Sequence, residues 1–66
     1  MVILLNGKKM EAGGANTIAD VVEKLQLPRE TVLIEYNGLA LHRHEWSTRP
    51  ISDGDRVELI RVVAGG

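Results

Sequence analysis

The chain has 66 residues, of which 44% are apolar and 26% charged. This length is enough for one small domain, which buries only about 60% of the surface that its unfolded chain exposes. It contains no cysteine, which excludes a disulfide framework, a thiol nucleophile and thiolate metal ligands. Eight basic and nine acidic side chains are spread along the chain, so we expect no nucleic-acid partner. The sequence shows no signal sequence and no apolar stretch of membrane-spanning length, so we expect a cytoplasmic protein with no membrane partner.

The first predicted element is a hairpin. Residues 1–5 form an apolar run of strand formers, and residues 8–12 would return beside them. Asn6-Gly7 lies between the two, and both of its residues tolerate the positive φ of a tight turn. Residues 13–16 have the composition of a loop.

A helix is predicted next. Thr17 is a good N-cap, and Asp20 three residues later completes a capping box. The following apolar residues recur at the spacing of one helix face: Ile18, Val21, Val22 and Leu25. We expect Leu27-Pro28 to end the helix, because proline disfavours helical geometry in the residue before it.

The second half of the chain predicts a second hairpin and a final strand. Residues 32–36 and 39–42 would pair across an Asn37-Gly38 turn. Residues 43–50 show no clear period and predict a loop with a helical turn. A turn over 52–55 then leads into a last strand over 56–63.

Together these elements predict an α+β domain over residues 1–66, in which one helix packs on one face of a mixed five-stranded sheet. The first and last strands are apolar at most positions, which is typical of central strands. Leu4, Ile60 and Val62 would then point away from the helix. They indicate either an imperfectly shielded sheet or an apolar docking patch, and we favour the patch because of the residues that follow it.

The chain ends in Ala64-Gly65-Gly66, which predicts a thin, flexible tail over residues 63–66 that can enter a narrow cleft. The cleft would receive the α-carboxylate of Gly66, which is ionised at neutral pH. A carboxylate resists nucleophilic attack until its oxygen becomes a leaving group, as in adenylation by ATP. Nothing else in the chain suits that chemistry, so the catalyst would be a partner protein.

These features resemble the ThiS family, the sulfur carrier proteins of thiamine biosynthesis. The resemblance runs through the chain in order, in Asn6-Gly7, residues 17–22, Asn37-Gly38, Arg43, Trp46, residues 54–58 and residues 63–66. Two positions depart from the family pattern: His42 stands where proline is common, and Ala64 stands where a third glycine is common.

The resemblance implies a ubiquitin-like β-grasp fold and a protein that acts as a co-substrate, not as an enzyme. Its Gly66 would be adenylated with ATP by an E1-like, ThiF-type adenylyltransferase, with no cofactor bound to the chain itself. A persulfide protein would supply sulfur to form a thiocarboxylate, which a ThiG-type thiazole synthase would consume. Partner contacts would involve Gly65, Ala64, Val62, Ile60 and Leu4.

Two other readings of the tail remain open. A ubiquitin-like modifier would join the activated Gly66 to a lysine of a target, and a plain interaction module would not need the two glycines. Other sulfur carriers with this tail serve molybdopterin, tRNA thiolation or cysteine synthesis.

Other polar clusters give weaker signals. His42 and His44 would share a strand face, but a histidine pair falls far short of a zinc signature. Asp53 and Asp55 flank a glycine and indicate a turn, because the other ligands of a calcium loop are missing. Trp46 is expected to be a core plug or loop anchor and not a binding platform.

Overall fold

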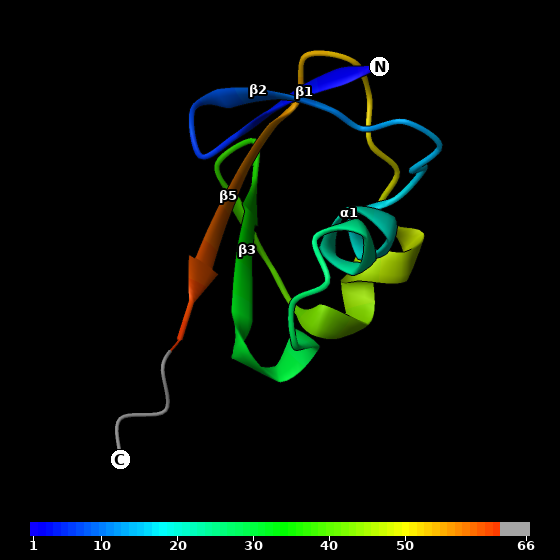
Figure 1. Ribbon diagram of the computed structural model, residues 1–66. Coiled ribbons are helices and arrows are strands. Elements are labelled where there is room, and N and C mark those ends of the chain that lie inside the picture. Colours follow the sequence, from blue (N-terminus) through cyan, green and yellow to red (C-terminus); the bar gives the residue numbers. More distant parts are fainter. Residues whose placement is uncertain (63–66) are drawn as a thin grey trace.

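A computed structural model describes residues 1–62, and Val63, the last residue of the predicted final strand, lies outside them with the tail. Along the chain the elements are β1 (Val2–Leu5), β2 (Lys8–Glu11), α1 (Ile18–Lys24), η1 (Arg29–Thr31), β3 (Val32–Tyr36), β4 (Leu39–Leu41), η2 (Arg43–Thr48) and β5 (Arg56–Arg61). The sheet has the strand order β2-β1-β5-β3-β4, and α1 lies on one side of it (Figure 1). This confirms the predicted five-stranded sheet with one covering helix.

The central strand is β5, and the sheet is mixed around it. It runs parallel to β1, with Leu4 beside Arg56, and antiparallel to β3, with Ile34 beside Leu59. The prediction that the first and last strands are interior is therefore confirmed. Strands β2 and β4 form the two edges, each joined to its neighbour by a hairpin.

Both hairpin turns have the backbone that the Asn-Gly pairs predicted. Asn6 and Gly7 have φ of 49° and 80°, and Asn37 and Gly38 have φ of 49° and 86°. Positive φ at both central residues gives a turn whose twist matches that of the flanking strands. The two predicted hairpins are therefore correct in position.

The capping box that begins α1 is present in both directions. The Asp20 backbone N–H donates to the Thr17 hydroxyl oxygen over 3.2 Å, and the Asp20 carboxylate accepts from the Thr17 N–H at 3.1 Å. The same carboxylate accepts from the Asn16 N–H at 2.9 Å. The Asn16 N–H, followed by that of Thr17, lowers the pKa of Asp20, because these bonds favour the ionised carboxylate.

The predicted end of the helix is wrong by a few residues. The last helical residue is Lys24, Leu25 is the C-cap, and Gln26 has a φ of 57°. A residue in the left-handed region ends a helix by turning its backbone away, so α1 stops before Pro28 exerts any restriction. The other bounds shift less: β4 ends at Leu41, and residues 43–48 form a 3₁₀ helix where a loop with one turn was predicted.

The core lies between the sheet and the helical elements. Its largest fully buried side chains are Ile3, Ile18, Val21, Val22, Val32, Trp46 and Val57. Trp46 has no exposed surface and its indole Nε1 has no hydrogen-bond partner among the described residues, while the Arg29 guanidinium lies 5.5 Å from the ring centroid. The interpretation of Trp46 as a core plug is therefore confirmed.

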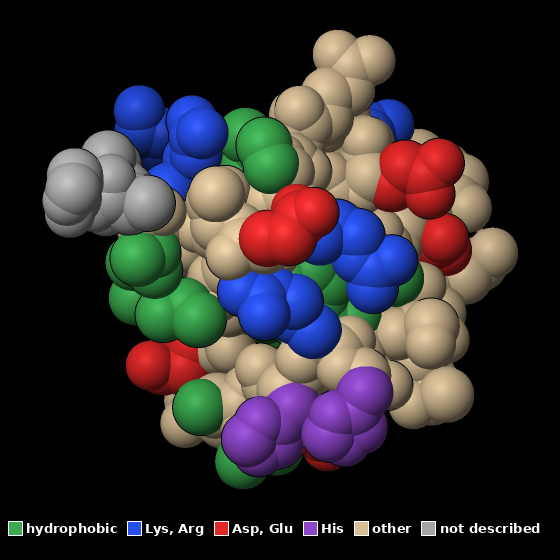
Figure 2. Space-filling view, turned by 90° about the horizontal axis from the view of Figure 1, so that it is seen from below, with side chains coloured by type: hydrophobic (Ala, Val, Ile, Leu, Met, Phe, Trp, Pro, Cys, Tyr) green, Lys and Arg blue, Asp and Glu red, His purple; other side chains and the backbone are tan. Residues whose placement is uncertain are grey.

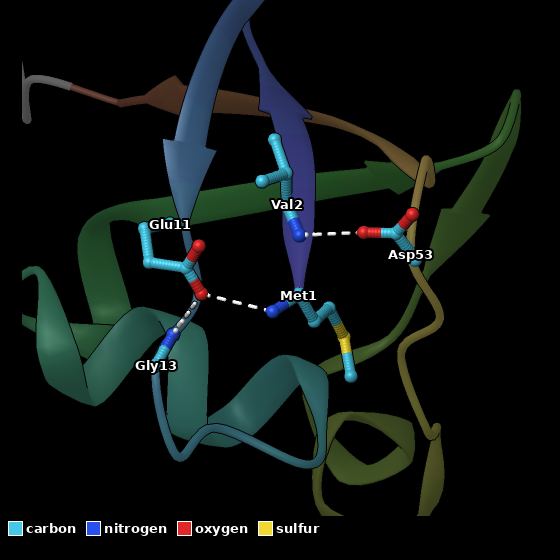
Figure 3. Close-up of polar contacts among 5 residues, drawn as sticks. All are labelled: Met1, Val2, Glu11, Gly13 and Asp53. Carbon is cyan, nitrogen blue, oxygen red and sulfur yellow. Dashed lines mark hydrogen bonds and ion pairs between the residues drawn. The ribbon is translucent and has the colours of Figure 1, made fainter.

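The N-terminus is fastened at the start of β1 (Figure 3). The Met1 amino group donates to Glu11 over 2.9 Å, and the same oxygen accepts from the Gly13 N–H. The Val2 N–H donates to the Asp53 carboxylate over 2.7 Å, which ties β1 to the turn that precedes β5. The Met1 contact raises the pKa of the amino group and lowers the pKa of Glu11.

Candidate functional site

The candidate site begins where β5 ends, because the tail continues from this strand. Val62 is the last described residue, and its backbone N–H donates to the Thr31 carbonyl over 2.6 Å. The chain is thus held beside η1 up to this residue. Ala64, Gly65 and Gly66, the predicted reactive tail, lie outside the described residues.

Two side chains of the turns hold β5 in place, and sequence reasoning missed both. The Asn6 amide accepts from the Leu59 N–H at 2.7 Å and donates to the Leu59 carbonyl over 3.1 Å. The Asn37 amide accepts from the Arg56 N–H at 2.8 Å and donates to Asp55 over 3.2 Å. The repeated Asn-Gly pair was the available signal, since an asparagine amide can both donate to and accept from a neighbouring strand.

Asp55 is the centre of a second group of contacts at the start of β5. It accepts hydrogen bonds from the Tyr36 hydroxyl at 2.6 Å, the Ser52 N–H at 2.7 Å and the Asn37 amide. Burial alone would raise the pKa of Asp55, but these hydrogen bonds outweigh it and lower the pKa. The bond to Asp55 also raises the pKa of Tyr36. These contacts confirm that residues 52–55 form a turn.

An apolar patch lies on the face of the sheet opposite α1. Its members are Leu33, Ile60 and Val62, which are 49%, 55% and 46% exposed. Leu33 and Ile60 are direct cross-strand partners between β3 and β5. Hydrophobic side chains gather at the left edge of Figure 2, on the sheet side of the molecule, with an acidic side chain next to them.

The sequence placed Leu4, Ile60 and Val62 on this outer face, and their exposure differs. Ile60 and Val62 are exposed, whereas Leu4 is half-buried between its partners Lys9 on β2 and Arg56 on β5. Leu33 was not predicted to take part, although its position opposite Ile60 follows from the strand register. The exposed apolar patch is therefore centred on β3 and β5, next to the point where the tail leaves.

The two histidines lie together at the start of η2. Their rings stack with centroids 5.5 Å apart and an angle of 8° between the planes, and Figure 2 shows them side by side. The His42 N–H donates to Glu45 over 3.0 Å, and this bond lowers the pKa of that carboxyl. Within residues 1–62, no group of three or more histidine, cysteine or acidic side chains is placed to hold a metal ion.

Comparison with known proteins gives the family. A family model described as the ThiS family matches residues 3–66. The chain belongs to the ThiS family. It is 29% identical over 66 residues to the sulfur carrier protein ThiS of Escherichia coli (strain K12), with both chains covered completely. It is 23% identical over 62 residues to the uncharacterized protein ycf40 of Trieres chinensis, covering 94% of this chain and 85% of that protein.

Solved structures agree with the family and the fold. The crystal structure of a thiamine biosynthesis protein (ThiS) from Geobacter metallireducens matches with a TM-score of 0.81 and 30% identity, and each chain is covered completely. A solution structure of a thiamine biosynthesis protein from the same organism matches with a TM-score of 0.80 over this whole chain and 88% of that one. The fold is thus the β-grasp fold of a ThiS protein. No helix within residues 1–62 is long and apolar enough to span a membrane.

Proposed function

We propose that this protein is a cytoplasmic sulfur carrier of thiamine biosynthesis and that its reactive group is the carboxylate of Gly66. Membership of the ThiS family carries the proposal, since the family match extends to Gly66. The exposed patch of Leu33, Ile60 and Val62 beside the base of the tail supports it, because an enzyme that reaches Gly66 would have this surface in front of it. The chain has no cysteine, so the sulfur would be held at the carboxyl terminus and not on a thiol.

The first chemical step is adenylation by an E1-like partner. A carboxylate oxygen of Gly66 attacks the α-phosphorus of ATP, and pyrophosphate leaves. The product is a mixed anhydride whose carbonyl carbon accepts nucleophiles that the carboxylate would repel. The tail suits this step because glycine has no Cβ to collide with a narrow active site.

Sulfur transfer follows. The terminal sulfur of a partner's persulfide attacks the Gly66 carbonyl, and AMP leaves with the electrons of the broken C–O bond. The acyl disulfide so formed is cleaved by a thiol, which takes the partner's sulfur into a new disulfide and releases the thiocarboxylate. A thiazole synthase then uses that sulfur, and the carrier returns with a carboxylate.

The adenylation step is tested by isotope exchange between pyrophosphate and ATP, with the purified E1-like enzyme as catalyst and this protein as substrate. The wild-type chain should support exchange, and a chain without Gly66 should not. Gly14→Ala is the matched control, because a Cβ at this glycine meets nothing within 4 Å. Exchange by the shortened chain at the wild-type rate would overturn the assignment of Gly66.

The same activated carboxyl group would serve a ubiquitin-like modifier, which differs only in its nucleophile. A modifier forms an amide with a lysine of a target protein, whereas a sulfur carrier yields a free thiocarboxylate. Conjugates of this chain with lysine in a cell extract, without a thiocarboxylate, would therefore replace the carrier assignment.

A further inference from the structure

Two acidic side chains face each other on the outer surface of the sheet. Glu35 of β3 and Glu58 of β5 are direct cross-strand partners, and both are exposed. Like charges directly opposite each other destabilise a sheet. Within residues 1–62 neither carboxylate forms an ion pair or accepts a hydrogen bond, and Arg56 on the same face pairs with neither of them. The outer face therefore carries two facing carboxylates that have no ion-pair or hydrogen-bond partner among the described residues.

This acidic pair adjoins the apolar patch. The next cross-strand pair on the same face is Leu33 with Ile60. A shallow hollow of about 180 Å³ lies here, lined by Glu35 and otherwise by apolar residues. The apolar lining residues are Leu33, Ile34, Ala40, Leu41 and Ile60. A surface that docks here meets an apolar hollow and two carboxylates at once.

The position of the tail indicates which protein covers this surface. Four residues follow Val62, the last of them Gly66, and a fully extended chain of that length spans at most about 14 Å. An enzyme acting on the Gly66 carboxyl must therefore approach within about 14 Å of Val62. Glu58 of β5 lies four residues before Val62, about 13 Å back at the rise of a β-strand. A specific interface covers about 800 Å² on each partner, which is wide enough to include both places.

We infer that the enzyme that adenylates Gly66 presents a cationic side chain to Glu35 and Glu58, next to an apolar side chain that enters the hollow. The inference rests on the proposed function and specifies the chemistry of its first partner. Covering two facing carboxylates with a neutral surface would leave them desolvated and unpaired, which is costly. A planar guanidinium donates through several N–H groups in a fixed fork, so an arginine is the side chain that best satisfies both.

The test compares two neutralised variants with the same change in net charge. Binding of the purified E1-like enzyme is measured by calorimetry for the wild type, for E35Q/E58Q and for E23Q/E30Q. Both control residues are exposed carboxylates outside the strands of the sheet, Glu23 in α1 and Glu30 in η1. We expect E35Q/E58Q to weaken binding by about tenfold or more and to flatten its dependence on salt, and E23Q/E30Q to change it less than about twofold.

The stability of the same variants gives a second readout. E35Q/E58Q should melt at or above the wild-type temperature, because a like-charge pair has been removed. Weaker binding by a protein that is at least as stable cannot come from unfolding. Equal binding by E35Q/E58Q and the wild type would overturn the inference. An equal loss of binding in E23Q/E30Q would also overturn it, because the effect would then not be specific to the facing pair.

Two further outcomes separate this inference from the proposed function. If E35Q/E58Q binds normally while the chain without Gly66 loses pyrophosphate exchange, the inference fails and the proposed function stands. If the chain without Gly66 keeps exchange, the proposed function itself fails. Sedimentation of the wild type alone tests whether a second copy of this chain covers the outer face instead of the enzyme. A dimer that the E35Q/E58Q substitutions disrupt would overturn the inference that the adenylating enzyme covers this face.

Discussion

Replacing Ile60 by aspartate gives the sharpest test of the apolar patch. Ile60 lies on the outer face of β5 and is 55% exposed, so the fold does not depend on most of its surface. The variant should therefore keep its secondary structure. What it should lose is affinity for the adenylating enzyme, because a charged side chain would occupy the centre of the patch.

The magnitude follows from the exposed fraction. Complete burial of an isoleucine side chain contributes about 1.5–3 kcal/mol, so docking over the exposed half contributes about 1 kcal/mol or slightly more. Covering an unpaired carboxylate adds a cost of at least about 1 kcal/mol. The sum is about 2 kcal/mol, which corresponds to roughly a 30-fold increase in Kd.

The assay is calorimetric binding to the purified E1-like enzyme. Leu39→Asp is the matched control, because Leu39 is 52% exposed and lies on the edge strand β4. Circular dichroism on both variants shows whether each one is folded. An affinity of Ile60→Asp within about twofold of the wild type, in a folded protein, would refute the docking role of this face, because the expected change is far larger.

Three further predictions concern the fold. Thr17→Ala removes the N-cap of α1 and should lower the stability by about 1 kcal/mol and the melting temperature by about 4–8 °C, and an unchanged melting curve would contradict this. Asp55→Asn should lower the melting temperature at pH 7, because the lowered pKa of Asp55 shows that the fold favours the ionised carboxylate. The difference in melting temperature should shrink as the pH falls below about 4 and through the folded-state pKa, where the carboxylate becomes protonated. Glu23→Gln is the control variant. A difference in melting temperature between Asp55→Asn and the wild type that stays the same at every pH would contradict this role of the Asp55 carboxylate. Acetylation of the Met1 amino group removes its charge and therefore its ion pair with Glu11, so the acetylated chain should melt below the free one. Equal melting would show that the ion pair adds no stability.

Local features of the sequence predicted most of the fold because they are encoded in neighbouring residues. The Asn-Gly turns needed only two residues with positive φ, and the capping box needed only Thr17 and Asp20. The early end of α1 at Lys24 was not predictable in this way. It depends on a left-handed Gln26, a residue type with no strong preference for that conformation.

Features that depend on distant residues escaped prediction. The amide of Asn6 bonds to Leu59, which lies 53 residues away along the chain, and the sequence does not show that the two meet. The alternation of residues along the last strand predicted that Ile60 would lie on the exposed face, and it does. The contribution of Leu33 and the opposition of Glu35 to Glu58 required the register between β3 and β5, which only the folded chain provides.

The central claim is that Gly66 carries sulfur, and the mass of the C-terminal peptide tests it most directly. The protein is incubated with ATP, the E1-like enzyme and a persulfide donor, and then digested and analysed by mass spectrometry. The account predicts that one oxygen of the Gly66 carboxylate is replaced by sulfur, and that omission of ATP prevents this. An unmodified C-terminal peptide, in a mixture that loads the E. coli carrier, would contradict it.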